Sequence, residues 1–205
     1  RLTALVGALG GTAVGLGMGA AGFRDGRPGP WTPLGAAVGG MAIGAMVKLI
    51  GLDAFQILLG AAPRDITGAP EGFVLGGAVG LGAWLGARSV PEGDAGVACR
   101  AAALAGLCGA AAGLAIALAG GRLMGGSLVL LTREFPGARL SLDGLGALFG
   151  EPAFGPTTQA VTAALEGGLF AACVAAAVCL TARRLGEVTW SDEPSARTDP
   201  GRRTT

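Results

Sequence analysis

Two glutamates that each precede a glycine are the residues of this chain most suited to chemistry in an apolar setting. Glu71 opens one apolar stretch with Gly72, and Glu166 stands before Gly167 in another. Glu71 follows Pro70, which suits the first turn of a helix, where the helix dipole stabilises a carboxylate. Glu166 lies more than one turn inside its apolar run. We therefore expect its carboxylate to face a wet pathway, to accept a structural hydrogen bond, or to be protonated by desolvation.

Two aspartates recur in similar surroundings. Asp53 and Asp143 lie in the segments LDAFQILLG and LDGLGALFG, and each segment ends at a glycine, Gly60 or Gly150. We expect Gly51 to break the helix ahead of Asp53, so that the aspartate becomes the N-cap of a short helix that Gly60 ends. Asp143 and Gly150 are expected to repeat this arrangement, with a contact to an ion or substrate as the alternative role of both aspartates.

Charges inside a bilayer are costly, which is why these residues are singled out. One Lys or Asp at the centre of a membrane helix opposes insertion by about 2.5–3.5 kcal/mol, whereas a large apolar residue favours it by about 0.3–0.6 kcal/mol. Such a charge persists when it snorkels, pairs or faces a polar cavity, and we expect Lys48 to snorkel to the headgroups. The candidate ion or substrate pathway consists of Glu166, Glu71, Asp53, Asp143 and Lys48. Broken helices at 49–60 and 140–150 favour a midplane site, although interfacial helices give the same pattern.

Other chemistry has little support in the sequence. The absence of His removes the commonest metal ligand and the usual acid–base catalyst. Cys99, Cys108, Cys173 and Cys179 lack a CxxC pair, and we interpret them as small core residues, with a disulfide or metal site as the alternative. Ser127 has neither a GxSxG context nor a His to activate it. We therefore predict no catalytic residue, metal, cofactor or enzymatic activity, with a membrane carboxylate enzyme as the alternative.

The elements that must position the charges carry small residues at every fourth position, which places each set on one helix face. Interior Gly costs a helix in water about 1 kcal/mol relative to Ala, but in lipid the backbone must close its own hydrogen bonds and the helix persists. The bare face then lets another helix approach closely. The sets are Gly7, Gly11, Gly15 and Gly19; Gly68, Gly72, Gly76 and Gly80; Ala101, Ala105, Gly109, Gly113, Ala117 and Gly121; and Ala160, Ala164, Gly168, Ala172 and Ala176.

Composition supports a membrane protein. Apolar residues make up 51% of the chain, charged residues 14%, and 40 of the 205 residues are Gly without the three-residue period of collagen. The net charge of +1 and the absence of Tyr give no case for a nucleic-acid partner. We predict an all-α, polytopic helical membrane bundle with small-xxx-small (glycine-zipper) packing, whose partners are the lipid bilayer and either further copies of the chain or other membrane subunits.

Six apolar runs define the expected helices. Four are long enough to span a bilayer core, and the runs at 34–47 and 123–132 are short. A signal peptide is the alternative interpretation of the first run. The long runs are 2–23, 72–87, 97–120 and 160–182.

The order of these elements indicates an internal duplication. We predict repeats at 1–93 and 94–185, each with a long helix, a short helix, an LD helix and a helix with an acidic start, followed by a disordered polar tail at 186–205. If both short runs cross the membrane, the second repeat is inverted. If both dip into it or lie at its surface, the repeats are parallel.

Function and location remain less specific. The basic pair Arg183-Arg184 after the last apolar run predicts a cytoplasmic C-terminus, in a bacterial-type inner membrane. Trp31, Trp84 and Trp190 fall near predicted helix ends, where the headgroup zone favours Trp. The leading hypothesis is a small channel or transporter of two fused repeats in which the four acidic residues of the pathway approach one another. The alternative is a membrane scaffold or anchor, or a subunit of a larger complex, without transport.

Overall fold

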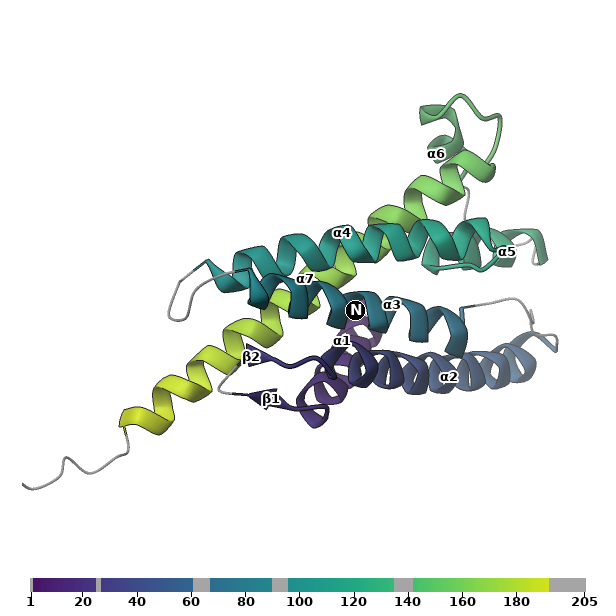
Figure 1. Ribbon diagram of the computed structural model, residues 1–205. Coiled ribbons are helices and arrows are strands. Elements are labelled where there is room, and N and C mark those ends of the chain that lie inside the picture. The colour runs from purple at the N-terminus through teal and green to yellow at the C-terminus, as the bar shows by residue number, and fades with distance from the viewer. Residues whose placement is uncertain (1, 25–26, 61–66, 90–95, 135–141, 192–205) are drawn as a thin grey trace, which may run out of the picture.

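Helices form almost the entire architecture, as predicted from the sequence (Figure 1). The computed structural model describes residues 2–24, 27–60, 67–89, 96–134 and 142–191. Within them, two strands of two residues each pair antiparallel, with Arg24 opposite Arg27. The elements are α1 (Leu2–Ala20), β1 (Phe23–Arg24), β2 (Arg27–Pro28), α2 (Thr32–Leu59), α3 (Ala69–Arg88), α4 (Val97–Leu118), α5 (Met124–Glu134), α6 (Asp143–Leu148) and α7 (Pro156–Ser191).

Three of the helices are long and apolar enough to cross a membrane. The segments are Thr32–Ile57 in α2, Ala98–Leu118 in α4 and Pro156–Ala182 in α7. The last two coincide with runs that the sequence predicts to span. The run at 72–87 lies in α3, which begins with Pro70 and Glu71 and falls outside this set among the described residues. These helices indicate that the protein resides in a membrane.

The expected helix break at Gly51 is wrong. α2 is 28 residues long, continues through Gly51 and ends at the C-cap Gly60. Gly60 has a left-handed φ of 71°, and its amide donates to the Gln56 carbonyl. A single interior glycine is tolerated because the hydrogen bonds of the helix run on either side of it. The short run at 34–47 is therefore part of a membrane-length helix, and Asp53 is not an N-cap.

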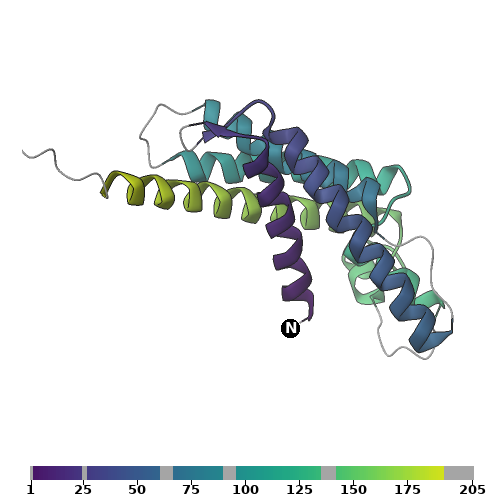
Figure 2. The same ribbon diagram turned by 90° about the horizontal axis from the view of Figure 1, so that it is seen from below.

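Neighbouring long helices pack antiparallel. α3 lies between α2 and α4, while α4 packs along α7 and α1 along α2 (Figure 1). Seen from below, α1 crosses α7 steeply (Figure 2). The bundle has two ends. We call one the hairpin end, where β1–β2, the start of α2, the end of α3 and the start of α4 lie together. The other is the joint end, with the end of α2, the start of α3 and the end of α4.

Glycines lie where the helix backbones approach most closely. A Cβ added at Gly72 would lie under 3.0 Å from the backbone of Gly40, and the reverse holds for a Cβ at Gly40. Gly82 meets Ala105 across α3 and α4 in the same way, and Gly109 meets Gly167 across α4 and α7. Further glycines whose added Cβ would lie under 3.0 Å from the backbone of the opposing element are Gly39, Gly44, Gly76, Gly80, Gly86 and Gly113, whereas at Gly68 the neighbour is the Lys48 side chain.

The glycine series of α1 lies differently. Gly7 and Gly19 have no atom within 4 Å of an added Cβ, and Gly11 and Gly15 meet valine side chains of α7 at an ordinary 3.4 Å. The close approach of α1 to α2 runs through Gly17, which faces Gly35 and belongs to none of the four sets predicted from the sequence. In the fourth series, an added Cβ at Gly168 would lie 3.1 Å from the Gly106 carbonyl oxygen of α4.

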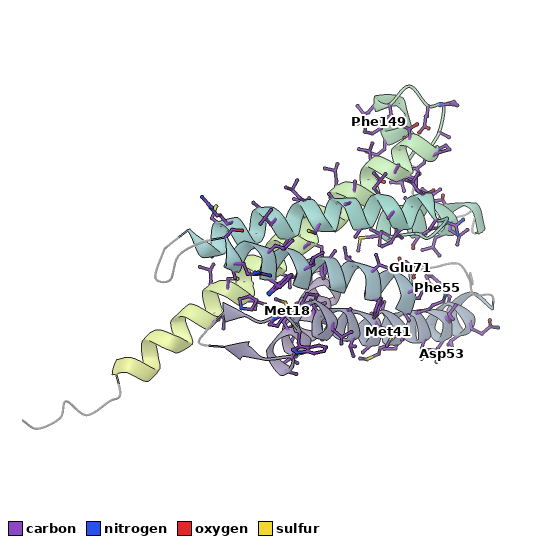
Figure 3. All side chains as sticks on the ribbon, viewed as in Figure 1. Met18, Met41, Asp53, Phe55, Glu71 and Phe149 are labelled. Atoms are coloured by element: carbon purple, nitrogen blue, oxygen red, sulfur yellow. The ribbon has the colours of Figure 1, made fainter. Side chains whose placement is uncertain are left out.

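The main core lies where the five long helices meet. Its side chains are small or β-branched apart from Met18, which is labelled in Figure 3, in keeping with helices packed at short distance. Many large apolar side chains lie on the outside, such as Leu107 (68% exposed) and Leu169 (67% exposed), as expected for a surface covered by lipid. The buried core consists of Val14, Met18, Ala36, Val79, Ala83, Ala105, Ala171, Val174 and Ala175.

The four cysteines do not all lie in the core. Cys179 is buried and Cys108 is half-buried, but Cys99 and Cys173 are exposed, so the prediction of core positions is wrong for two of them. None of the four forms a disulfide in the described part of the chain. In a bilayer, exposed positions of α4 and α7 contact lipid, where a small apolar thiol is tolerated as well as in a protein core.

The two predicted repeats differ in their middle elements. In the first half the short run and the LD segment form one helix, α2, whereas in the second half they form α5 and α6, which are 11 and 6 residues long. At 1.5 Å per residue, α5 spans about 16 Å, roughly half of a bilayer core. Both predicted topologies assumed that the two short runs form equivalent elements. The structure shows that they do not, since one lies within α2 and the other forms α5. The duplication itself stays a prediction.

Candidate functional site

The segment after α4 folds back into the bundle through two glycines. Gly120 has a φ of 83°, in the left-handed region, and the Gly121 amide donates to the Ile116 carbonyl at 2.9 Å. This pattern closes the C-terminus of a helix and reverses the chain. Residues 121–125, the last two of which open α5, consequently reach the start of α3 and one face of α7.

Glu166 binds the start of α5. Its Oε1 accepts a hydrogen bond from the Gly125 amide at 2.8 Å, and the side chain is half-buried. The first amides of a helix have no partner within the helix and carry partial positive charge, so a carboxylate there is stabilised twice. Of the three environments expected for Glu166, the structure shows the hydrogen-bonded one.

Glu71 performs the corresponding role for its own helix. Its Oε2 accepts from the Gly68 amide at 2.9 Å, as the position after Pro70 predicts for the first turn of α3. Its Oε1 lies 3.2 Å from the point where a Cβ of Gly121 would stand. Glu71 and Glu166 thus approach the same short segment, 121–125, from α3 and from α7.

Lys48 reaches this region from α2. Its Cδ lies 2.7 Å and its Nζ 3.5 Å from the position of an added Cβ at Gly68, beside the Glu71 carboxylate (Figure 3 labels Glu71). The aliphatic stem of Lys48 therefore packs on the start of α3, and the snorkelling of its ammonium to the headgroups stays a prediction.

Two side chains donate hydrogen bonds to backbone carbonyls of segment 121–125. Thr67 Oγ1 donates to the Arg122 carbonyl at 2.8 Å and lies 3.1 Å from Ser127 Oγ of α5. Gln159 Nε2 of α7 donates to the Gly121 carbonyl at 3.3 Å. We call this set the polar joint: Thr67, Gly68, Glu71, Gly121, Arg122, Gly125, Ser127, Gln159 and Glu166.

The two aspartates of the predicted pathway do not join it. Asp53 is exposed, on the side of α2 away from Glu71 (Figure 3). Asp143 is the first residue of α6, after the N-cap Leu142, and its side chain lies outside the described part of the structure. The N-cap position is therefore Leu142, one residue before the predicted Asp143, and a role of the Asp143 side chain stays a prediction.

A further acidic residue, Glu151, was missed in the sequence. Its Oε1 accepts from the Thr157 amide at 2.9 Å, and its Oε2 accepts from the amide and hydroxyl of Thr158. Chiefly the hydrogen bonds from Thr158 lower the pKa of Glu151 to about 2. The sequence did contain a signal for this cap. Pro favours the first position of a helix, so Pro156 indicates a helix start, and an acidic residue shortly before it is a candidate cap. Glu151 thus caps α7.

At the polar joint two carboxylates accept from backbone amides at helix starts, and two hydroxyl groups contact a carbonyl oxygen and each other. Oxygens of this kind suit a proton or a small ion. Among the described residues, no group of three or more His, Cys, Asp and Glu side chains is placed to hold a metal ion. The chain matches no protein-family model, and no curated protein or solved structure is significantly similar to it.

Proposed function

We propose that the chain is a non-enzymatic integral membrane protein that acts as a small channel or transporter, with the polar joint as the point of passage. One observation carries the proposal: a carboxylate on a membrane-length helix binds the N-terminus of a helix too short to cross. Discontinuous helices whose ends point at charged groups form the midplane sites of many transporters. Irregular backbone at this depth is tolerated where it is buried in protein or lines a polar cavity.

The depth of Glu166 supports this role. It lies ten residues after Pro156, where the candidate span of α7 begins. At 1.5 Å per residue the separation along α7 is about 15 Å, and the segment that Glu166 binds follows Leu118, where the candidate span of α4 ends, so the carboxylate lies inside the α7 span at the joint end of the bundle. A carboxylate is expensive inside a membrane span, so a merely structural function would be served at lower cost by an uncharged cap such as Ser or Asn.

A membrane scaffold is the second candidate, and the glycine contacts favour it. We propose that they act as a glycine zipper, in which backbones touch from α2 through α3 and α4 to α7. Such packing gives a rigid frame. In this role, outward apolar residues such as Leu107 and Leu169 bind further membrane helices, and Glu166 serves only to fasten α5.

We also propose that the hairpin end faces the cytoplasm, in a bacterial-type inner membrane. Cytoplasmic segments carry an excess of Lys and Arg, irrespective of Asp and Glu. The described basic residues at the hairpin end, including the part of α7 beyond it, are Arg24, Arg27, Arg88, Arg100, Arg183 and Arg184, against Lys48, Arg122 and Arg133 at the joint end.

A thiol at Ser127 tests passage. In a variant without the four native cysteines, Ser127→Cys places the thiol beside Thr67 and leaves Glu166 intact. The measurement is its rate of labelling by a small, membrane-impermeant reagent in vesicles of known orientation. Leu107→Cys, on the outer face of α4, is the control expected to stay unlabelled.

If the joint conducts, Ser127→Cys is labelled in the native membrane, and Glu166→Gln changes the rate because the start of α5 loses its anionic partner. Labelling of Ser127→Cys that begins only after denaturation contradicts a channel or transporter and leaves the scaffold.

A further inference from the structure

Two arginines, Arg88 and Arg100, lie at the corner where α3 ends and α4 begins. Arg88 lies with its guanidinium carbon 4.7 Å from the centre of the Trp84 ring. Arg100 Nη1 donates to the carbonyl of Ser89, the residue that follows Arg88, at 3.3 Å. Both side chains are exposed, and no ion pair between described residues involves either. Two exposed guanidinium groups therefore lie at this corner, and neither pairs with a carboxylate among the residues that the structure describes there, 67–89 and 96–134.

The corner lies at the level expected for lipid headgroups. Arg100 is the third residue of the candidate span Ala98–Leu118, and Gly86, just before Arg88, packs against Ala101. Trp84 lies one turn further in, and Trp31, 67% exposed, precedes α2 at the same end. Trp prefers the zone between headgroups and acyl chains, so both arginines lie close to the level of the lipid phosphates.

We propose that Arg88 and Arg100 form a binding site for the phosphate of an anionic phospholipid headgroup. A guanidinium presents several N–H donors in a planar fork that matches phosphate oxygens, and a pair of them favours a lipid with net negative charge. The indole of Trp84 restricts Arg88 through a cation–π contact, and the Ser89 carbonyl restricts Arg100, so both donors are oriented before lipid binds. The site rests on the bundle being embedded in a membrane, but not on passage through the polar joint.

The experiment measures lipid binding to the purified full chain in a neutral detergent. Phosphatidylglycerol or phosphatidylcholine is titrated, and the apparent affinity is taken from the rise in the thermal midpoint. Loss of one surface arginine is expected to weaken binding of the anionic lipid roughly fivefold, so Arg88→Gln with Arg100→Gln weakens it roughly 25-fold. Arg88→Lys with Arg100→Lys retains most of the charge and much of the binding. Arg133→Gln, in α5 at the opposite end, is the matched control and binds as the unmodified chain does.

Three results overturn the proposal: equal affinity of the double Gln variant and the unmodified chain, an equal loss in Arg133→Gln, or equal stabilisation by phosphatidylcholine. Stabilisation by inorganic phosphate to the same extent identifies a free anion as the occupant and also overturns it. If the double variant does not fold, Arg88→Gln and Arg100→Gln are tested singly by lipid retention in native mass spectrometry. Since Ser127 labelling is measured separately, a dry polar joint leaves this result intact.

Discussion

Substituting Ala for two adjacent glycines of α3, Gly76 and Gly77, distinguishes the steric cost of an added methyl group from the gain in helix propensity. A Cβ at Gly76 would lie under 3.0 Å from the Ala36 backbone of α2, whereas a Cβ at Gly77 finds only the Ala37 methyl at 3.5 Å, an ordinary contact. Replacing Gly by Ala in a helix gains up to about 1 kcal/mol in both variants. Only Gly76→Ala forces two backbones apart, which typically costs about 1–3 kcal/mol.

The free energy of unfolding of Gly76→Ala is therefore expected to lie about 1–3 kcal/mol below that of Gly77→Ala. For a chain of this size, each kcal/mol lowers the thermal midpoint by about 2–4 °C, measured by circular dichroism in a mild detergent. Gly7→Ala, whose Cβ meets nothing within 4 Å, is a second control and should match Gly77→Ala. Equal midpoints for Gly76→Ala and Gly77→Ala would refute the close backbone approach of α2 and α3.

Three further changes probe the caps and the polar joint. The pKa of Glu151 near 2 lies below its ordinary 4.5, so its ionised form stabilises the fold above about pH 4.5 and this contribution is lost as the pH falls toward 2. Glu151→Gln should flatten this part of the acid unfolding curve, and an unchanged curve would contradict the cap. Thr67→Val removes the donor to the Arg122 carbonyl and should lower the free energy of unfolding in detergent by about 1–3 kcal/mol. Thr12→Val, the control, removes an exposed hydrogen bond to the Ala8 carbonyl of the same helix and should lower it by less than about 1 kcal/mol. Gly60→Ala should cost about 1–2 kcal/mol in the same assay because its φ is left-handed although its Cβ site is open; no loss would show that α2 ends otherwise.

The helical class and much of the helix placement were predictable because long apolar runs admit few alternatives. The sequence located α4 and α7, the acidic start of α3 at Glu71, and the end of α2 at Gly60. It misplaced the middle of α2, because Gly51 and Lys48 resemble a boundary when only local propensities are weighed. The structure instead continues the helix and packs the stem of Lys48 against Gly68 of α3.

The polar joint depends on tertiary geometry, which a single sequence does not specify. Glu166 and Gly125 are 41 positions apart, and only the reversal at Gly120 and Gly121 brings the start of α5 to α7. Asp53 looked equivalent to Asp143 by spacing, yet the former lies within a long helix and the latter begins a short one. Spacing in an Ala- and Gly-rich chain therefore indicates which residues share a helix face more reliably than which segments correspond.

The most direct test of this account is a disulfide between α5 and α7 in native membranes. In a variant without the four native cysteines, Gly125→Cys and Thr162→Cys place two thiols close together, since a Cβ at Gly125 would lie 3.6 Å from Thr162 Oγ1. The same Cβ would lie 2.8 Å from Glu166 Oε1, so the flexible end of the Glu166 side chain has to shift in this variant. Mild oxidation should cross-link this pair rapidly, whereas Gly144→Cys with Thr162→Cys should stay reduced because nothing lies within 4 Å of a Cβ at Gly144. Cross-linking no faster than in that control pair would show that α5 does not dock beside Glu166, and the polar joint would be abandoned.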